Sequence, residues 1–322
     1  MRFPMSLQLK RRPLLALGLA LGIFTALPWT AQADTQVRIG YQKSSTLISL
    51  LKTQGSLEQV LGKQGIRISW HEFPNGQPLL EALNVGNIDV SADVADTVPV
   101  FAQAAGARLT YFAEETASPT AQAILVHEHS ALRDLSDLKG KKVAVTKAAG
   151  SHYLLLAALT KAGLSFSDIQ PAYLTPADGR AAFENGKVDA WVAWEPFLSS
   201  AQQQLDTRTL ADGQGLADYK RYYLASSTFA AQHPQVLETL FEELVRTGQW
   251  LRQNPQEAAS ILGPLWGNLD PAIVEKANAR RSYDVRKVNA QSLGEQQKIA
   301  DAFFKEKLLP GKVDAQDVTI WN

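Results

Sequence analysis

The sequence of 322 residues contains no cysteine, and it has no excess of charge of either sign because 32 basic residues balance 32 acidic ones. The absence of cysteine excludes disulfides, thiol catalysis, thiolate metal sites and a lipid anchor on an N-terminal cysteine. The sequence also lacks low-complexity tracts, blocks of like charge and short-period repeats, which argues against disordered tails and repeat architectures. The balanced charge gives no electrostatic basis for binding nucleic acid or an anionic membrane.

Long apolar runs are also scarce, and the one that is present lies at the N-terminus. Basic residues at positions 10–12 precede an apolar run from Pro13 to about Pro28, which ends at the small-residue pattern Ala31-Gln32-Ala33. This run is shorter than the roughly 18 to 20 residues of a membrane-spanning helix. We therefore predict a signal peptide over residues 1–33, cleaved after about Ala33, and a soluble periplasmic protein without a lipid anchor. Cleavage would leave 28 basic residues against 32 acidic ones.

The mature chain of about 290 residues is long enough for two domains. After Asp34, short apolar segments alternate with helical patterns, which is typical of βαβ units and a mainly parallel sheet. In this first unit we expect strands at 37–41, 66–70, 88–90 and 109–113 and helices at 47–61, 79–85 and 98–105.

The same alternation starts again near residue 123 and indicates a second α/β unit. Here we expect strands at 123–126, 143–145, 172–174, 188–192 and 221–225, with helices at 151–162 and 177–185; from Pro234 onward the pattern is almost entirely helical. The order predicts lobe I from residues 34–121 and 221–322, with the C-terminal helices, and lobe II from residues 122–220. Ligands of such sheets bind at the carboxyl ends of the strands, so we expect the site in a cleft between the lobes.

Three segments place small polar residues between the end of a strand and the start of a helix. They are 41–46 with Gln42, Ser45 and Thr46, 95–97 with Asp96 and Thr97, and 146–152 with Ser151 and His152. Free backbone N–H groups and hydroxyls at helix starts bind anions, although ordinary N-capping explains any single segment as well. Their recurrence in both units favours an anion site.

Other readings of polar and aromatic residues remain open. Ser151 beside His152 permits a nucleophile and base, but no G-x-S-x-G motif surrounds the serine. His127 and His129 share a strand face, as in some metal sites, but no third ligand completes a set, so we expect no metal and no cofactor. Trp191 and Trp194 are expected on opposite faces of their strand, with Trp194 available as an apolar wall.

Several of these segments resemble the aliphatic-sulfonate-binding proteins of ATP-binding-cassette importers. The resemblance rests on residues 38–43, 81–89 and 101–107 in the first unit and on residues 151–156, 173–183 and 188–191 in the second. It covers nearly all of the mature chain. It implies the type II periplasmic-binding fold with two lobes and a cleft that closes on a sulfonate, and delivery of that ligand to a membrane permease with its ATPase for sulfur acquisition.

The sequence departs from the family pattern near the expected site. Glu195 replaces the usual aspartate after Trp194, and the stretch 91–99 with Asp93 differs from the usual glycine-rich one. If Asp93 and Glu195 face the cleft, they would favour a ligand that carries an ammonium group, such as an aminosulfonate; the alternative is a capping or solvent-facing role. The candidate ligand-binding residues are therefore Gln42, Ser45, Thr46, Asp93, Asp96, Thr97, Ser151, His152, Trp194 and Glu195.

We therefore predict a monomeric, non-enzymatic binding protein for an alkanesulfonate. Taurine or another aminosulfonate, a sulfate ester and nitrate are alternative ligands. From other classes, an exported hydrolase that uses Ser151 and a pyrimidine-precursor enzyme on a similar fold remain alternatives. Export from the cytosol argues against the second of these.

Overall fold

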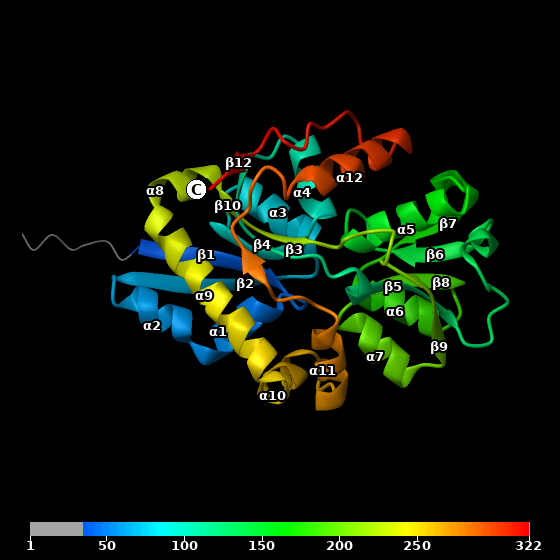
Figure 1. Ribbon diagram of the computed structural model, residues 1–322, viewed down its shortest axis with the longest axis horizontal. Helices are drawn as coiled ribbons and strands as arrows, with labels where there is room; N and C mark the ends of the chain where they lie inside the picture. The colour runs from blue at the N-terminus through cyan, green and yellow to red at the C-terminus, as the bar shows by residue number, and fades with distance from the viewer. Residues whose placement is uncertain (1–34, 322) are drawn as a thin grey trace, which may run out of the picture. The chain divides into compact units, whose positions relative to one another are not determined.

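The computed structural model describes residues 35–321, so the predicted signal peptide lies outside the described part of the chain. In this part the strands form one sheet of seven strands and one of five (Figure 1). We call the seven-stranded sheet with its helices lobe I and the five-stranded sheet with its helices lobe II.

Lobe I is built from both ends of the described chain. Its strands run in the order β11-β4-β10-β3-β1-β2, and β12 pairs with β4. The bounds are β1 (Thr35–Gln42), β2 (Ile66–Phe73), β3 (Val90–Ala95), β4 (Leu109–Glu115), β10 (Arg221–Ser226), β11 (Val285–Arg286) and β12 (Thr319–Ile320).

Helices cover both faces of the lobe I sheet. The bounds are α1 (Thr46–Gln54), α2 (Ser56–Gly62), α3 (Gly76–Asn84), α4 (Thr97–Ala104), α8 (Ser227–Gln232), α9 (Pro234–Gln253), α10 (Pro255–Leu265), α11 (Pro271–Ala279) and α12 (Gly294–Lys305). One apolar core joins α1, α2, α9, α10 and α11 to one face, and a second joins α3 and α4 to the other. Burial of these two faces fixes the sheet as the middle of three layers.

Lobe II has the strand order β7-β6-β8-β5-β9. The bounds are β5 (Gln122–His127), β6 (Lys142–Val145), β7 (Gln170–Tyr173), β8 (Ala190–Trp194), β9 (Thr207–Asp212), α5 (Gly150–Lys161), α6 (Pro176–Glu184) and α7 (Phe197–Gln204). Helix α5 packs on one face of this sheet, and α6 and α7 lie on the other.

The chain passes between the two sheets twice. Residues 116–121 lead from β4 to β5, and residues 213–220 lead from β9 to β10. The two passages are hydrogen-bonded to each other, since Ser118 N–H donates to the Asp218 carbonyl at 2.9 Å and Gly213 N–H donates to the Pro119 carbonyl at 3.0 Å. A side chain at Gly213 would overlap that same carbonyl oxygen, so only glycine permits this approach. The two passages are thus held together as one connection.

Helix α12 packs on helices of both lobes. It lies beside α4 of lobe I, and its Ile299, Ala300 and Phe303 share a core with Leu154 and Leu155 of α5 (Figure 1). The C-terminal part of the chain therefore completes the apolar interior beneath α5.

The α/β class with helix-flanked sheets is confirmed, but the expectation that the sheets are mainly parallel is wrong. Among the described strands of lobe I three pairings are parallel and three antiparallel, and in lobe II two are parallel and two antiparallel. The strands that follow each passage, β5 and β10, insert antiparallel to their neighbours. A sequence pattern of alternating strands and helices does not reveal this reversal of strand direction.

Several predicted elements differ by a few residues at their ends, and three differences bear on the site. The helix expected at 47–61 is two helices, because Gly55 adopts a left-handed conformation (φ 67°) and closes α1. The strand expected at 88–90 begins at Val90 and runs to Ala95, so Asp93 lies within a buried strand. The strand expected at 188–192 is β8, which extends to Trp194.

Candidate functional site

A small cavity lies between the two lobes at the ends of their strands. It is lined by Gln42, Asn75, Gly76, Ala95, Val98 and Arg221 of lobe I, by Ala149, Gly150 and Trp194 of lobe II, and by Tyr219 of the second passage. Its volume is about 10 Å³, which is about the room of one water molecule. The structure is therefore a closed form whose lobes must separate before a small molecule can enter.

Helices begin around this cavity from both lobes. Asn75 caps α3 by accepting a hydrogen bond from Gln77 N–H at 3.1 Å, and Asp96 caps α4 by accepting from Thr97 N–H at 2.9 Å. At α5 the cap residue is Ala149, and within the described chain no side chain caps its first turn. The free N–H groups and positive end of this helix are therefore available to an anion at the cavity wall.

Arg221 brings a guanidinium group to the same cavity. Its side chain is 2% exposed; Nε donates to Oδ2 of Asp93, and Nη1 donates to the Tyr219 hydroxyl at 2.9 Å. These contacts hold the guanidinium in place while leaving further N–H groups on Nη1 and Nη2. An arginine fixed in this way is suited to bind an oxyanion.

The carboxylate of Asp93 belongs to a buried ionic cluster behind the cavity. Its Oδ2 also accepts from Arg281 Nη2 at 3.1 Å, and Arg281 donates to Glu115 Oε2 at 2.6 Å. Complete burial raises the pKa of Asp93, and the charges of Arg221 and Arg281 oppose that rise. With two arginines and two carboxylates the cluster is formally neutral, so the cavity does not repel an anion.

Glu195 connects the lobes at a second point. It follows Trp194 in the chain and accepts from Ser199 Oγ at 2.8 Å and from Arg280 Nη1 at 2.5 Å. Arg280 lies at the end of α11 in lobe I, and its Nη2 also donates to Gln202 Oε1 of α7 at 2.7 Å. Burial raises the pKa of Glu195 while Arg280 opposes the rise. Arg280 Nη1 also donates to Ser199 Oγ at 3.2 Å. We call the contacts of Arg280 with Glu195, Ser199 and Gln202 the interlobe latch.

Of the residues proposed from the sequence, Gln42 and Trp194 line the cavity. Gln42 Nε2 donates to the Asp93 carbonyl at 3.0 Å, which fixes its side chain beside Arg221. Trp194 lies on the lobe II side with its ring edge-on to Phe197.

Ser45 and Thr46 are buried next to Gln42 but are used inside lobe I. Ser45 Oγ accepts from Gln42 N–H at 3.2 Å. Thr46 Oγ1 accepts from Arg281 Nη1 at 3.1 Å and contacts the Tyr283 hydroxyl at 3.2 Å. The Thr46 hydroxyl thus supports the ionic cluster, and the Ser45 hydroxyl supports the Gln42 backbone.

Asp96 and Thr97 start α4, and Asp96 also contacts the second passage. Its Oδ2 accepts from Lys220 N–H at 3.0 Å, and its own N–H donates to the Lys220 carbonyl at 3.0 Å. Burial raises the pKa of Asp96 to about 7. Its observed contacts thus join α4 to the chain segment that leads into β10.

Asp93 and Glu195 would favour an ammonium group only if their carboxylates were free in the cleft, but both carboxylates already have arginine partners. The charge argument for an aminosulfonate therefore does not follow from these two residues.

Ser151 and His152 do not interact as a nucleophile and base. Among residues 35–321, Ser151 Oγ and His152 Nε2 have no hydrogen-bond partner, and His152 Nδ1 accepts from Ala148 N–H at 3.3 Å. The imidazole packs among the rings of Phe101, Phe166, Tyr173 and Phe303. Burial, with a smaller effect of Lys147, lowers the pKa of His152 to about 3.

Several residues outside the predicted set belong to the site or its closure, among them Asn75, Gly76, Arg221 and Arg280. Asn75 and Gly76 follow β2 and begin α3, so they repeat the pattern of a strand end, a small polar residue and a helix. Arg221 was detectable as a charge that opens the apolar segment 221–225. Arg280 gives no local signal, because its partners are about 80 residues away in the sequence.

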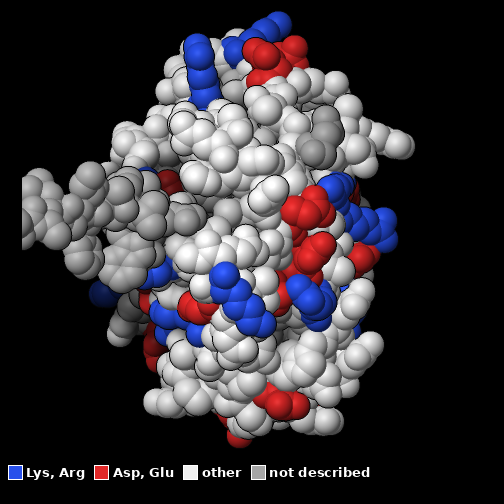
Figure 2. Space-filling model, turned by 90° about the vertical axis from the view of Figure 1, so that its left-hand side faces the viewer, with Lys and Arg blue, Asp and Glu red and all other residues white. Residues whose placement is uncertain are grey.

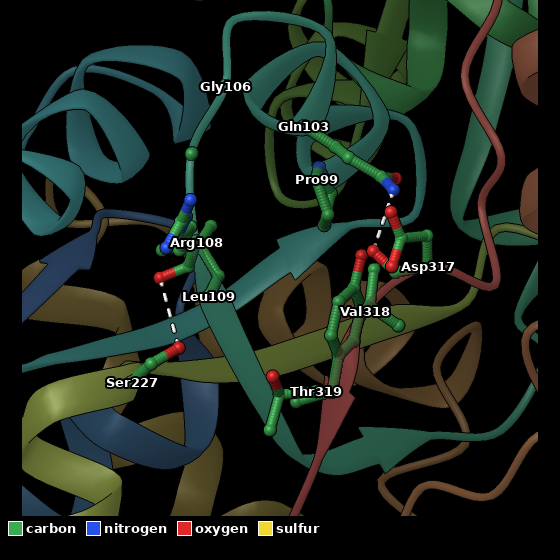
Figure 3. Close-up of a pocket in the computed structure, with 11 residues that line it drawn as sticks. Pro99, Gln103, Gly106, Arg108, Leu109, Ser227, Asp317, Val318 and Thr319 are labelled. Carbon is green, nitrogen blue, oxygen red and sulfur yellow. Dashed lines mark hydrogen bonds between the residues drawn. The ribbon is translucent and has the colours of Figure 1, made fainter.

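A larger hollow of about 630 Å³ lies in lobe I between α4, the start of β4 and β12 (Figure 3). Part of its polar lining is hydrogen-bonded: Gln103 Nε2 donates to the Asp314 and Asp317 carbonyls, and Ser227 Oγ donates to the Arg108 carbonyl. It involves one lobe only. The cavity with Arg221 and the start of α5 is therefore the better candidate for an anion site.

The surface and the helices give two further findings. On the face turned toward the viewer in Figure 2, acidic and basic side chains lie side by side rather than in patches of one sign. Across residues 35–321 no helix has the length and apolarity needed to cross a membrane, and no three metal-ligating side chains come together.

Two α/β lobes joined by two passages, with an anion-suited cavity between them, define a solute-binding protein of the periplasmic-binding fold. The NMT1/THI5-like family model matches residues 62–258. A putative aliphatic sulfonates-binding protein of Escherichia coli is 40% identical over 96% of this chain and 95% of its own length. The chain therefore belongs to the NMT1/THI5-like family and, within it, to the group of relatives named aliphatic-sulfonate-binding proteins.

Solved structures agree with this assignment. The periplasmic aliphatic sulphonate binding protein SsuA of Escherichia coli is 41% identical, with a TM-score of 0.80 over 89% of this chain and 97% of that one. The alkanesulfonate-binding protein SsuA of Xanthomonas axonopodis pv. citri, bound to MOPS, is 41% identical, with a TM-score of 0.82 over 87% and 96%. The desulfurization enzyme DSZB, at 14% identity and a TM-score of 0.63, shares the fold alone.

Proposed function

We propose that this chain is the solute-binding component of an ATP-binding-cassette importer and captures an aliphatic sulfonate in the cavity between its lobes. The observation that carries the proposal is the meeting of the Arg221 guanidinium and the uncapped start of α5 at one cavity. The relatives named sulfonate-binding proteins support the same ligand class.

The proposed mechanism is capture without chemistry. In the closed form the sulfonate contacts Arg221 of lobe I and the α5 N–H groups of lobe II, and Trp194 covers the carbon chain. Contacts with both lobes favour closure because only the closed form makes all of them. The closed form is then the one that the membrane permease recognises.

An enzymatic role receives no support from the Ser151–His152 pair. A base whose pKa is about 3 has little capacity to accept a proton at neutral pH. Turnover of a chromogenic ester that is lost in Ser151→Ala would contradict the non-enzymatic role.

We also propose export to the periplasm, removal of residues 1–33 and function as a monomer, with lobe boundaries at the two passages. Mass spectrometry of the protein recovered from the periplasm should give an N-terminus at Asp34. Light scattering should give the mass of one chain.

Calorimetric titration of the mature protein with ethanesulfonate, butanesulfonate, MOPS, taurine, sulfate and nitrate tests the ligand class. We expect binding of the sulfonates and a loss of about 10- to 100-fold in affinity in Arg221→Gln, because a charge-assisted hydrogen bond is removed. The double variant Arg221→Gln/Asp93→Asn keeps the cluster neutral and separates loss of binding from loss of folding.

Arg38→Gln is the matched control, since Arg38 lies on the same sheet but pairs with Asp89 at 2.6 Å outside the cavity. It should bind like the wild type. Failure of every sulfonate to bind would reject the proposed function.

A further inference from the structure

Gln122, the first residue of β5, has an unusual environment. It is fully buried, yet among the described residues neither Nε2 nor Oε1 of its amide has a hydrogen-bond partner. Buried amides are nearly always hydrogen-bonded, so a buried amide with neither group paired needs a specific explanation.

The strand register places Gln122 opposite a residue that lines the cavity, although Gln122 is not itself a lining residue in the closed form. It pairs with Trp194, the cavity residue at the carboxyl end of the antiparallel strand β8. Residues directly opposite in such a pair project from the same face of the sheet. Gln122 and Trp194 therefore project from the same face, at the edge where α5 begins.

A second unpaired polar group lies at the start of α5. Ser151 is fully buried and, within residues 35–321, its Oγ has no partner. It shares a helix face with Leu154, Leu155 and Ala158, which pack against Ile124 and Val126 of β5. Ile124 is two residues after Gln122, so Gln122 and Ser151 both belong to the layer between this sheet face and α5.

We propose that Gln122 is a specificity-determining residue that selects sulfonates with a hydroxyl or amino group on the second carbon from sulfur. Nε2–H donates to a sulfonate oxygen, and Oε1 accepts the hydrogen bond of the ligand's O–H or N–H group. A sulfonate with a plain alkyl chain pairs Nε2–H but leaves Oε1 buried and unpaired. Binding of such a ligand is therefore weaker. The inference rests on the proposed function, because it concerns the same ligand and the same cavity.

Gln296 provides a matched comparison. It is also buried, but its Oε1 accepts from the Tyr111 hydroxyl at 3.1 Å and its Nε2 donates to the Asp96 carbonyl at 3.0 Å. One buried glutamine is thus satisfied by the protein itself, whereas Gln122 is not. Gln296→Met should lower the melting temperature without changing ligand selectivity, and Gln122→Met should keep or raise the melting temperature.

The test is calorimetric titration of the wild type, Gln122→Met and Gln296→Met with 2-hydroxyethanesulfonate and propanesulfonate, which have the same number of heavy atoms. We expect the affinity of the wild type and of Gln296→Met for 2-hydroxyethanesulfonate to exceed their affinity for propanesulfonate by at least about tenfold. In Gln122→Met this preference should disappear.

Three results would overturn the inference. If Gln122→Met keeps the wild-type affinities and preference, Gln122 does not contact the ligand, and the proposed function stands. If it weakens both ligands equally, Gln122 contacts the sulfonate group without selecting the tail. If the wild type binds neither these nor the other sulfonates, the proposed function fails and the inference fails with it.

Discussion

At the scale of single residues, the side chains that line the cavity are fixed by hydrogen bonds to residues behind them. Arg221 lines the cavity, but Asp93 and Tyr219 determine where its guanidinium lies. Asp93 in turn is shared with Arg281, which also contacts Glu115. Binding of an anion therefore requires little movement of the arginine, and such preorganisation favours affinity.

His152 predicts a pH dependence of stability. Burial lowers its pKa to about 3 in the folded chain, against an ordinary value of 6.5. Below pH 6.5 the unfolded chain therefore binds a proton that the folded chain does not, so this residue lowers the free energy of unfolding as the pH falls. Between pH 6.5 and 4 we expect a loss of about 3 kcal/mol that is absent in His152→Phe.

Urea denaturation of both proteins at several pH values measures this difference. His127→Phe is the control, because that ring is only partly buried and stacks on Phe183. If the free energy of unfolding depends on pH equally in the wild type and in His152→Phe, the prediction is wrong.

At the scale of elements, the start of α5 determines how closely the lobes approach. A Cβ atom on Gly150 would overlap a ring carbon of Tyr219 and would lie 2.9 Å from the Ala95 Cβ. Gly150 belongs to lobe II, Ala95 belongs to lobe I, and Tyr219 lies in the second passage. The closed form therefore depends on the absence of a side chain at this helix start.

Gly150→Ala should consequently hinder closure more than folding. We expect at least about a tenfold loss of sulfonate affinity with a small change in melting temperature, because the open form has no such clash. Gly294→Ala is the matched control: Gly294 also begins a helix of 12 residues, and within the described chain a Cβ atom added there would have no atom within 4 Å apart from near neighbours. Unchanged affinity in Gly150→Ala would show that the lobes do not close this tightly on the ligand.

The elements that the sequence predicts best are those with a strong internal pattern. Strands β1, β4 and β10 and helices α4, α5 and α6 lie within a few residues of their expected positions. Strands β9, β11 and β12 were not predicted, because β9 lies at a sheet edge with half-buried residues and β11 and β12 have only two residues each. Local periodicity carries little information about such segments.

The candidate site was predictable only in part, for a related physical reason. A strand end followed by a small polar residue identified the right chain segments, but it did not distinguish a residue that faces the cavity from one that braces its neighbour. Gln42 and Ser45 illustrate this, since one lines the cavity and the other accepts a hydrogen bond from it. Partners such as Asp93 and Arg221, which are 128 residues apart, require the fold itself.

At the scale of the whole molecule, the interlobe latch should control how long the closed form persists. The side chain of Arg280 is 22% exposed and that of Glu195 is 3% exposed, so the pair is shielded from solvent more than a surface pair. Removing one partner of such a pair leaves a buried carboxylate uncompensated in the closed form only. We expect Arg280→Gln to raise the rate of ligand dissociation about tenfold and to shift the ligand-free protein toward the open form.

Stopped-flow dissociation and small-angle scattering measure these two effects. If the two residues act through each other, the double variant Arg280→Gln/Glu195→Gln should dissociate no faster than Arg280→Gln alone. Arg286→Gln, which removes an exposed pair with Asp284, should behave like the wild type. If Arg280→Gln releases the ligand at the wild-type rate, contacts other than the interlobe latch hold the closed form.

The position of α12 also has a consequence for the order in which the molecule folds. Ile299, Ala300 and Phe303 complete a core whose other residues, such as Leu154, precede them by about 145 positions. A chain that crosses a membrane from its N-terminus onward leaves this face of α5 uncovered until its last residues arrive. The lobe in the middle of the sequence thus cannot be completed before the C-terminal part of the chain arrives, and a chain lacking its final 30 residues would expose an apolar surface suited to aggregation or to a chaperone.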